Sequence, residues 1–283
     1  MTGNSALRLG ADPDRDASAA GGLKLSIVTV CYNQGNFLDA CLRSVHEQAV
    51  PFPLEHIVVE AGSTDGVTQA VIGRRADWIS KVIWGKDQGP GDGLNKGFAA
   101  ATGTHFMYLN ADDILLPNAL LAVGEAVAAQ QDVDVWIGNG LILNEQGVAC
   151  RPVYSDRWSD VGYAYGAVTA LQQATFFTAD AFRATAGFNL QNRTCWDGEL
   201  LVDLSLQGAR FAHVESFIGG FRVYPASITG SGRLRDRYRE DQRRIFIKLR
   251  GRPRHPGDDV FALLARCAKR ARAASLTLTG RRR

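Results

Sequence analysis

Short apolar segments alternate with helix-like segments over the first 120 or so residues, and this alternation constrains the fold more than any other feature. Leu25–Cys31 is short, rich in β-branched residues and bounded by turn-forming residues, which predicts a buried strand. Leu54–Glu60 and residues 79–84 and 105–109 have the same character. Strands joined by helices form a mostly parallel sheet with helices on both faces. We therefore expect a Rossmann-like α/β domain that binds ligands at the carboxyl ends of its strands.

The second half of the chain is less regular. We expect a helix over residues 196–207 and a mixed, smaller sheet built from residues 133–137, 140–143, 174–177, 211–214 and 220–224. Two Arg-rich helices follow, over residues 234–249 and 260–274, separated by two prolines. The expected organisation is a disordered segment (1–22), one α/β domain (23–230) and a basic helical C-terminal extension (231–283).

Composition excludes several classes of protein. The longest apolar stretch, residues 119–129, contains Glu125 and falls short of the roughly 20 residues that a membrane span needs. The N-terminal segment lacks the basic start and apolar centre of a signal peptide, so we expect a cytoplasmic protein. Five cysteines without a CxxC pair indicate buried thiols rather than disulfides or a zinc site.

Charge is distributed unevenly along the chain. Residues 231–283 contain 17 Lys and Arg against 5 Asp and Glu, whereas residues 1–230 contain 15 against 24. A basic tail is attracted to polyanions, and we expect peripheral contact with the anionic inner face of a membrane. A solvated helical cap is the alternative. We expect no nucleic-acid partner, because the tail has neither interleaved aromatic residues nor a known binding motif.

Acidic residues follow three of the predicted strands. Glu60 ends the second strand, Asp87 follows the third, and Asp112 and Asp113 follow the fourth. Carboxylates gathered at one sheet edge repel one another unless a cation or a hydrogen-bonded ligand neutralises them. Without a Cys/His set they favour a hard ion such as Mg²⁺ or Mn²⁺. Alternatively, Asp112 and Asp113 cap the helix that begins near Pro117.

Five segments recur in a family-like order and spacing. They are SIVTVCYN (26–33), VVEAGSTDG (58–66), DQGPGDGLNKG (87–97), ATG (101–103) and LNADD (109–113). Together they resemble the motifs of family 2 glycosyltransferases with the GT-A fold, over about residues 24–228. This chain has Glu60 where the family usually has Asp, and Tyr224 in a segment that often carries His.

The resemblance implies a nucleotide-diphosphate sugar donor and a metal-dependent transferase. It implies that the donor is bound by Val30, Tyr32 and Glu60 at its base, Asp112 at its ribose, and Asp87 and Lys96 along the pocket. It assigns Asp113 to a Mn²⁺ or Mg²⁺ ion that bridges the diphosphate. The acceptor would be a saccharide or a lipid-linked molecule, in the synthesis of a surface polysaccharide or glycolipid.

A second acidic motif lies in the later half. The segment CWDGELL (195–201) resembles the family's acidic motif at a helix start, which implies that Asp197 is the general base. A carboxylate suits this role because it must take the proton of the acceptor hydroxyl. One base without a second catalytic carboxylate implies direct displacement with inversion.

The sequence also allows other interpretations of these residues. Asp197 could instead stabilise the start of its helix. A nucleotidyltransferase, or a non-catalytic module that binds nucleotide sugars, are the alternatives for the whole chain.

Overall fold

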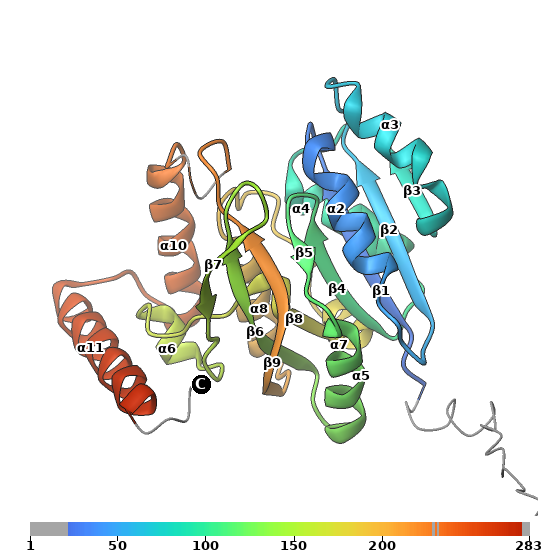
Figure 1. The fold of residues 1–283 in the computed structure, drawn as a ribbon. Coiled ribbons are helices and arrows are strands. Elements are labelled where there is room, and N and C mark those ends of the chain that lie inside the picture. The colour runs from blue at the N-terminus through green and yellow to red at the C-terminus, as the bar shows by residue number, and fades with distance from the viewer. Residues whose placement is uncertain (1–21, 228–229, 231, 279–283) are drawn as a thin grey trace, which may run out of the picture.

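The computed structural model describes residues 22–227, 230 and 232–278 (Figure 1). Within these residues nine strands form one sheet. The strands are β1 (Leu25–Cys31), β2 (Leu54–Glu60), β3 (Lys81–Trp84), β4 (His105–Asn110), β5 (Ile114–Leu115), β6 (Val135–Leu143), β7 (Ala149–Val153), β8 (Thr175–Thr178) and β9 (Phe211–Arg222). The helices are α2 (Gly35–His46), α3 (Val67–Arg74), α4 (Pro90–Ala100), α5 (Ala119–Ala129), α6 (Asp160–Ala164), α7 (Ala179–Arg183), α8 (Trp196–Leu206), α10 (Arg235–Arg250) and α11 (Pro256–Leu278).

The first four strands form the parallel half of the sheet, in the order β3-β2-β1-β4. Cys31 pairs with Glu60, and Val30 pairs with Asn110, so β1, β2 and β4 end at the same level. The loops after these strands therefore meet at one edge of the sheet. This confirms the predicted α/β architecture.

The later strands continue this sheet instead of forming a smaller one beside it. β8 pairs antiparallel with β4 and with β6, and β6 runs parallel to β9. Each of the two expected strand pairs, 133–137 with 140–143 and 211–214 with 220–224, is one long strand. The register shifts around Asn139 absorb the residues that appeared to separate them.

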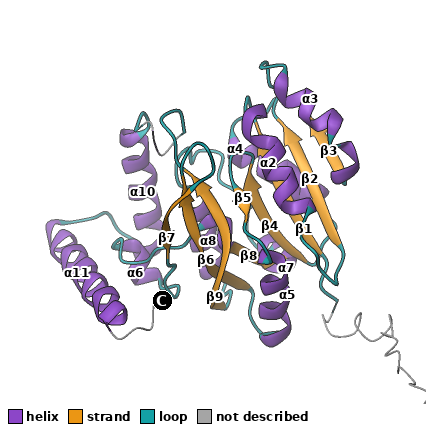
Figure 2. Ribbon diagram, viewed as in Figure 1, coloured by secondary structure: helices purple, strands orange, loops and turns teal. Residues whose placement is uncertain are grey.

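Helices cover both faces of the sheet, as Figure 2 shows. Side chains of β1 alternate between the faces: Leu25 and Ile27 pack with α2 and α5, whereas Val28 and Val30 pack with α4 and α8. Gly97 lets α4 approach the sheet closely, because a Cβ there would lie 2.3 Å from Cγ1 of Val28. The two apolar layers hold the strand ends at fixed positions.

Helices α10 and α11 lie on the side of the molecule away from β3 (Figure 1). α10 packs against α6 and α8. A small buried cluster joins Phe246 of α10, Ala262 of α11 and Tyr165, which follows α6. No helix in the described part of the chain has the length and apolarity required to cross a bilayer. The expectation of disorder over residues 1–22 falls, except for Gly22, outside the described residues.

Candidate active site

A cleft of about 770 Å³ opens at the carboxyl ends of β1 and β4. The loop after β3 and the start of α8 both contribute to its lining. Its lining includes Val30, Tyr32, Gln34, Phe37, Asp87, Asn110, Asp112, Gln173, Trp196, Asp197, Phe221, Tyr224 and Arg233. Five of the eight residues singled out in the sequence line it: Val30, Tyr32, Asp87, Asp112 and Asp197.

Asp87 is held at the cleft by the glycine-rich segment that follows it. Its Oδ1 accepts a hydrogen bond from the backbone N–H of Gly89 at 2.8 Å. Gly89 has φ of +117°, which favours glycine, and a Cβ at Gly93 would lie 2.8 Å from Oδ2 of Asp87. Burial raises the pKa of Asp87. These glycines thus serve the placement of a carboxylate at the edge of the cleft.

Asp112 and Asp113, adjacent in sequence, have different environments. Asp112 lines the cleft, and its Oδ2 accepts a hydrogen bond from the hydroxyl of Tyr224 at 3.1 Å. Burial raises the pKa of Asp112. The capping alternative for this pair is wrong, because the residue at the N-cap of α5 is Asn118.

Asp113 is 1% exposed and does not line the cleft. Its carboxylate accepts hydrogen bonds from Gln173 Nε2 at 2.7 Å, Asn110 Nδ2 at 3.2 Å and the backbone N–H of Arg222 at 2.9 Å. Burial, followed by the neighbouring Asp112, raises its pKa. The geometry therefore departs from the expectation for Asp113: its oxygens join β4, β9 and the segment before β8, and the carboxylate that faces the cleft belongs to Asp112.

Glu60 and Lys96 also lie outside the cleft lining. Glu60 is 2% exposed, and its carboxylate accepts hydrogen bonds from the backbone N–H groups of Gly62 and Ser63, so it shapes the loop after β2. Lys96 forms an ion pair with Asp92 at 2.9 Å, one turn earlier on α4. Lys96 also donates to the backbone oxygen of Lys86 at 3.1 Å, in the loop after β3. Glu60 and Lys96 therefore each hold a loop that borders the cleft.

Asp197 lines the same cleft as Asp87 and Asp112. It is the second residue of α8, next to Trp196, and both line the cleft. Burial raises the pKa of Asp197. A carboxylate whose pKa is raised by burial holds a proton more readily than an exposed one.

Sequence reasoning missed three residues that organise the site. Tyr224 donates to Asp112, Gln173 donates to Asp113, and Arg222 binds the backbone oxygen of Asp112 through Nε at 2.7 Å. Arg222 is only 4% exposed and lies over the ring of Phe37 at 4.9 Å. The available signal was that Arg222 is the one charged residue in the expected strand over residues 220–224, since buried charges are paired or hydrogen-bonded.

Two curated relatives illustrate what the chain is similar to. An uncharacterized glycosyltransferase of Nostoc sp. is 30% identical over 131 residues, which cover 44% of this chain and 40% of that protein. The O-antigen biosynthesis protein RfbC of Myxococcus xanthus is 30% identical over 139 residues, which cover 48% of this chain and 11% of that protein. The matched region thus spans less than half the length of either relative.

Solved structures show the same fold at low sequence identity. The S. aureus protein TarS 1-349 in complex with UDP-GlcNAc has a TM-score of 0.66 at 17% identity, covering 87% of this chain and 72% of that chain. The mannosyltransferase PcManGT from Pyrobaculum calidifontis, in complex with GDP-Man and Mn²⁺, has a TM-score of 0.60 at 16% identity, covering 93% of this chain and 81% of that chain. These likenesses support the GT-A fold.

The family is shown by the sequence itself. The sequence model described as Glycosyl transferase family 2 matches residues 26–182, which is more than half of the 283 residues. The match begins in β1, includes the ends of all four parallel strands and extends into α7. The chain therefore belongs to glycosyl transferase family 2.

Proposed function

We propose that the cleft transfers a sugar from a nucleotide-diphosphate donor to an acceptor hydroxyl, with inversion at the anomeric carbon. One observation carries this proposal: Asp112 and Asp197, which are 85 positions apart in the sequence, line the same cleft. The first follows a parallel strand and the second begins a helix of the later half. The nucleotide sugars bound in TarS 1-349 and PcManGT, which share the fold, support a donor of the same class.

The donor side of the cleft has the groups that a nucleotide requires. Val30 and Tyr32 would contact the base, since Tyr32 presents a 58% exposed aromatic side chain at the cleft. Asp87 would line the donor pocket. Glu60 and Lys96 would contribute by holding the loops around it, because their own polar groups are bound within those loops.

The chemistry of the donor set fits a Mg²⁺ or Mn²⁺ ion shared with the donor. Within the described residues, no three His, Cys, Asp or Glu side chains cluster closely enough to hold a metal by themselves. Mg²⁺ commonly binds one or two carboxylates together with substrate phosphates and waters. Asp112 would hold the ion, with Asp113 behind it fixing the loop. When bound, the ion stabilises the negative charge that develops on the departing diphosphate.

Asp197 would act as the general base. The hydroxyl oxygen of the acceptor attacks the anomeric carbon, its proton passes to the carboxylate of Asp197, and the bond between that carbon and the diphosphate oxygen breaks. Attack on the face opposite the leaving group inverts the configuration. Proton transfer of this kind typically contributes about 10² to 10⁴ in rate.

Release of nucleoside diphosphate from a panel of UDP- and GDP-sugars, with and without Mn²⁺, tests the proposal. We expect release from at least one donor, a higher melting temperature with that donor, and loss of both effects after chelation, because a ligand that binds only the folded state stabilises it. A protein that is stabilised by no nucleotide and releases no diphosphate would contradict the proposed function.

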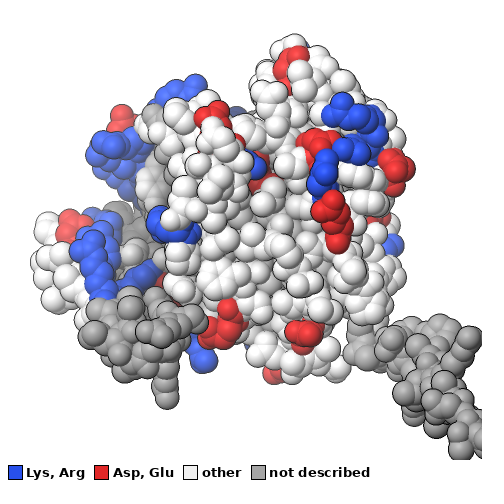
Figure 3. Space-filling model, in the orientation of Figure 1, with Lys and Arg blue, Asp and Glu red and all other residues white. Residues whose placement is uncertain are grey.

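We also propose that the acceptor is lipid-linked or part of a surface polysaccharide, and that α11 binds an anionic membrane surface. The O-antigen biosynthesis relative supports this acceptor class. Ala262 faces the body, whereas Val260, Leu263 and Leu264 are 60%, 57% and 62% exposed. Exposed arginines accompany this apolar face, and Lys and Arg lie over α10 and along α11 in Figure 3. Such a helix lies in the membrane interface.

Co-sedimentation with vesicles tests the membrane proposal. The protein should sediment with phosphatidylglycerol vesicles and much less with phosphatidylcholine vesicles. The double variant Leu263→Ser/Leu264→Ser should lose this binding, whereas Ile247→Ser, a 45% exposed position on α10, should keep it. Equal binding of the double variant and the unaltered protein would refute the assignment of α11.

A further inference from the structure

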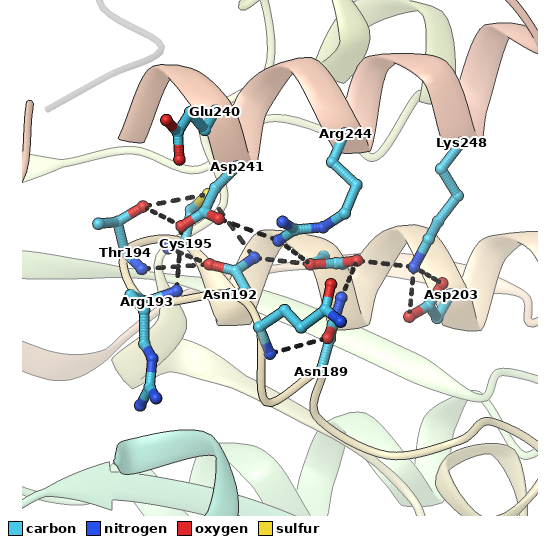
Figure 4. Close-up of polar contacts among 12 residues, drawn as sticks. Asn189, Asn192, Arg193, Thr194, Cys195, Asp203, Glu240, Asp241, Arg244 and Lys248 are labelled. Atoms are coloured by element: carbon cyan, nitrogen blue, oxygen red, sulfur yellow. Dashed lines mark hydrogen bonds and ion pairs between the residues drawn. The ribbon is translucent and has the colours of Figure 1, made fainter. Parts of the chain in front are cut away.

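Helix α10 binds the loop that leads into Asp197. Asp241 of α10 is fully buried, and its Oδ2 accepts hydrogen bonds from the backbone N–H of Arg193 at 3.0 Å and from the hydroxyl of Thr194 at 2.7 Å. Figure 4 shows Asp241 directed at this loop from the helix above it. A residue 48 positions later in the chain thus anchors the two residues that precede the N-cap of α8.

Two cations of α10 bind the first turn of α8 as well. Arg244 donates to Glu199 at 3.1 Å, and Lys248 donates to Glu199 at 2.8 Å and to Asp203 at 2.7 Å. Glu199 is 1% exposed. Burial acts to raise its pKa, but hydrogen bonds from Arg244, Lys248, Asn189 and Asn192 together lower the pKa to about 2. Two of the four groups that hold this carboxylate in its charged form therefore come from α10.

The loop is attached on its donor side too. The side chain of Asn95, on α4, accepts from the N–H of Phe188 and donates to its carbonyl, both at 2.8 Å. Arg193 reaches across to the carbonyl of Gln88, in the loop after β3. The segment from Phe188 to Thr194 is thus held between the donor half of the molecule and α10.

The start of α8 requires such support. Its N-cap is Cys195, whose side chain makes no capping hydrogen bond. The first N–H groups of a helix have no partner within the helix, and an unsupported end frays. Contacts from α10 hold the chain on both sides of Trp196 and Asp197: Asp241 binds Arg193 and Thr194 before them, and Arg244 and Lys248 bind Glu199 after them.

We propose that Asp241, Arg244 and Lys248 are positioning residues that hold Asp197 in its catalytic orientation, so that α10 is part of the active site and not an appended tail. This inference rests on the proposed function, in which Asp197 is the base. In this inference the three side chains act on the reaction only through the position of Asp197. Loss of these contacts should lower kcat with little change in donor binding, because Asp87 and Asp112 keep their own hydrogen bonds from Gly89 and Tyr224.

Backbone hydrogen–deuterium exchange in Asp241→Asn tests the positioning directly. The matched control is Asp236→Asn, which removes an aspartate of the same helix whose side chain is 92% exposed. Exchange of peptides covering residues 188–199 should rise about tenfold in Asp241→Asn, since a charge-assisted hydrogen bond contributes roughly 1.5–3 kcal/mol. The control should match the unaltered protein.

Steady-state diphosphate release supplies the second readout. In Asp241→Asn, kcat should fall about tenfold to a hundredfold, as small displacements of reacting groups do, with KM for the donor nearly unchanged. If Asp241→Asn does not fold, Arg244→Gln serves in its place, and Arg244→Lys should recover part of the lost kcat.

The outcomes separate this inference from the proposed function. Unchanged exchange together with unchanged kcat would overturn the inference. So would a fall in kcat that is proportional to the loss of melting temperature across the variants and that Arg244→Lys does not recover. If the unaltered protein releases no diphosphate, the proposed function fails. In that case, increased exchange over residues 188–199 would still establish that α10 holds the loop, whereas unchanged exchange would refute this too.

Discussion

The cleft has two parts: the one we propose for the donor contains Asp87 and Asp112, and the one we propose for the acceptor contains Asp197. The structure positions the acidic residues of these donor and acceptor halves in different ways. On the donor side, Asp87 and Asp112 lie within three residues of the ends of β3 and β4, and the parallel register brings those ends together. On the acceptor side, Asp197 begins a helix without a side-chain cap and depends on contacts from α10, such as the bond between Arg193 and Asp241. Strand ends bring Asp87 and Asp112 to the cleft, and contacts from Gln173 and Arg222 then fix the orientation of the Asp112–Asp113 pair. The start of α8 has no strand end to position it, so Asp197 relies on the polar network from α10.

This difference has a physical basis. A strand end is fixed by its backbone ladder, which joins β4 to β1 and β8 and joins the edge strand β3 to β2, so residues that follow it inherit its position. A helix start has unsatisfied N–H groups and needs partners from elsewhere. Substitutions in the two halves should therefore produce different defects.

The largest expected effect is that of Asp197→Asn. It should lower kcat for diphosphate release by about 10² to 10⁴ because the amide cannot accept the acceptor proton, while the donor raises the melting temperature as before. Asp180→Asn, at a 98% exposed side chain of α7, is the control. Full activity of Asp197→Asn would reject the base assignment.

A comparison of Asp112→Asn with Asp113→Asn sharpens the donor half. Asp112→Asn should abolish the added stabilisation that Mn²⁺ gives in the presence of UDP, because it removes the carboxylate that lines the cleft. Asp113→Asn should lower the melting temperature by several degrees, since a buried acceptor with three donors loses about 1–3 kcal/mol. Melting temperatures measured with and without Mn²⁺ and UDP test this. If Asp113→Asn abolishes the stabilisation by Mn²⁺ and Asp112→Asn does not, Asp113 is the metal ligand.

Acid should weaken the network around Asp197 through Glu199. Because the folded pKa of Glu199 is lowered to about 2 from an ordinary value of 4.5, its contribution to stability is complete above pH 4.5 and is lost as pH falls toward 2. The melting temperature of Glu199→Gln should therefore lie about 5 °C below that of the unaltered protein at pH 6, with a smaller gap at pH 3. A gap that does not change with pH would contradict a role for the charged carboxylate.

The smallest expected effect is that of Glu60→Asp. The shorter side chain should weaken the hydrogen bonds to Gly62 and Ser63, which contribute about 1 kcal/mol each. We expect KM for the donor to rise about threefold to tenfold at constant kcat. Steady-state kinetics over a range of donor concentrations measures this, and a fall in kcat without a change in KM would place Glu60 in the reaction instead of in the loop.

Much of the donor half could be predicted from the sequence. The apolar strand β1 and the glycine-rich segment after Asp87 have local patterns that predict both the strand and the turn. The sequence could not distinguish Asp112 from Asp113. Adjacent residues point in different directions, and which of them faces the cleft depends on Gln173 and Arg222, which lie 60 and 109 residues away.

The sequence predicts both C-terminal helices and indicates that they form a basic extension. Their positive charge indicated a solvated cap or a membrane contact. In the structure the basic residues of α10 have different partners. Arg244 and Lys248 pair with the buried Glu199, whereas Arg239 pairs with Asp236 at the surface. Composition gives only the sum of these charges, and the packing of α10 against α8 decides which of them pair with Glu199.

From the sequence alone follow the alternating strands and helices, the family motifs and the acidic residues at strand ends, because each depends on neighbours within a few positions. Only the tertiary structure decides which carboxylate faces the cleft and what holds Asp197, because both depend on hydrogen bonds between segments more than 40 residues apart. Backbone periodicity is a local property, whereas the pairing of buried charges is set by the packing of distant segments.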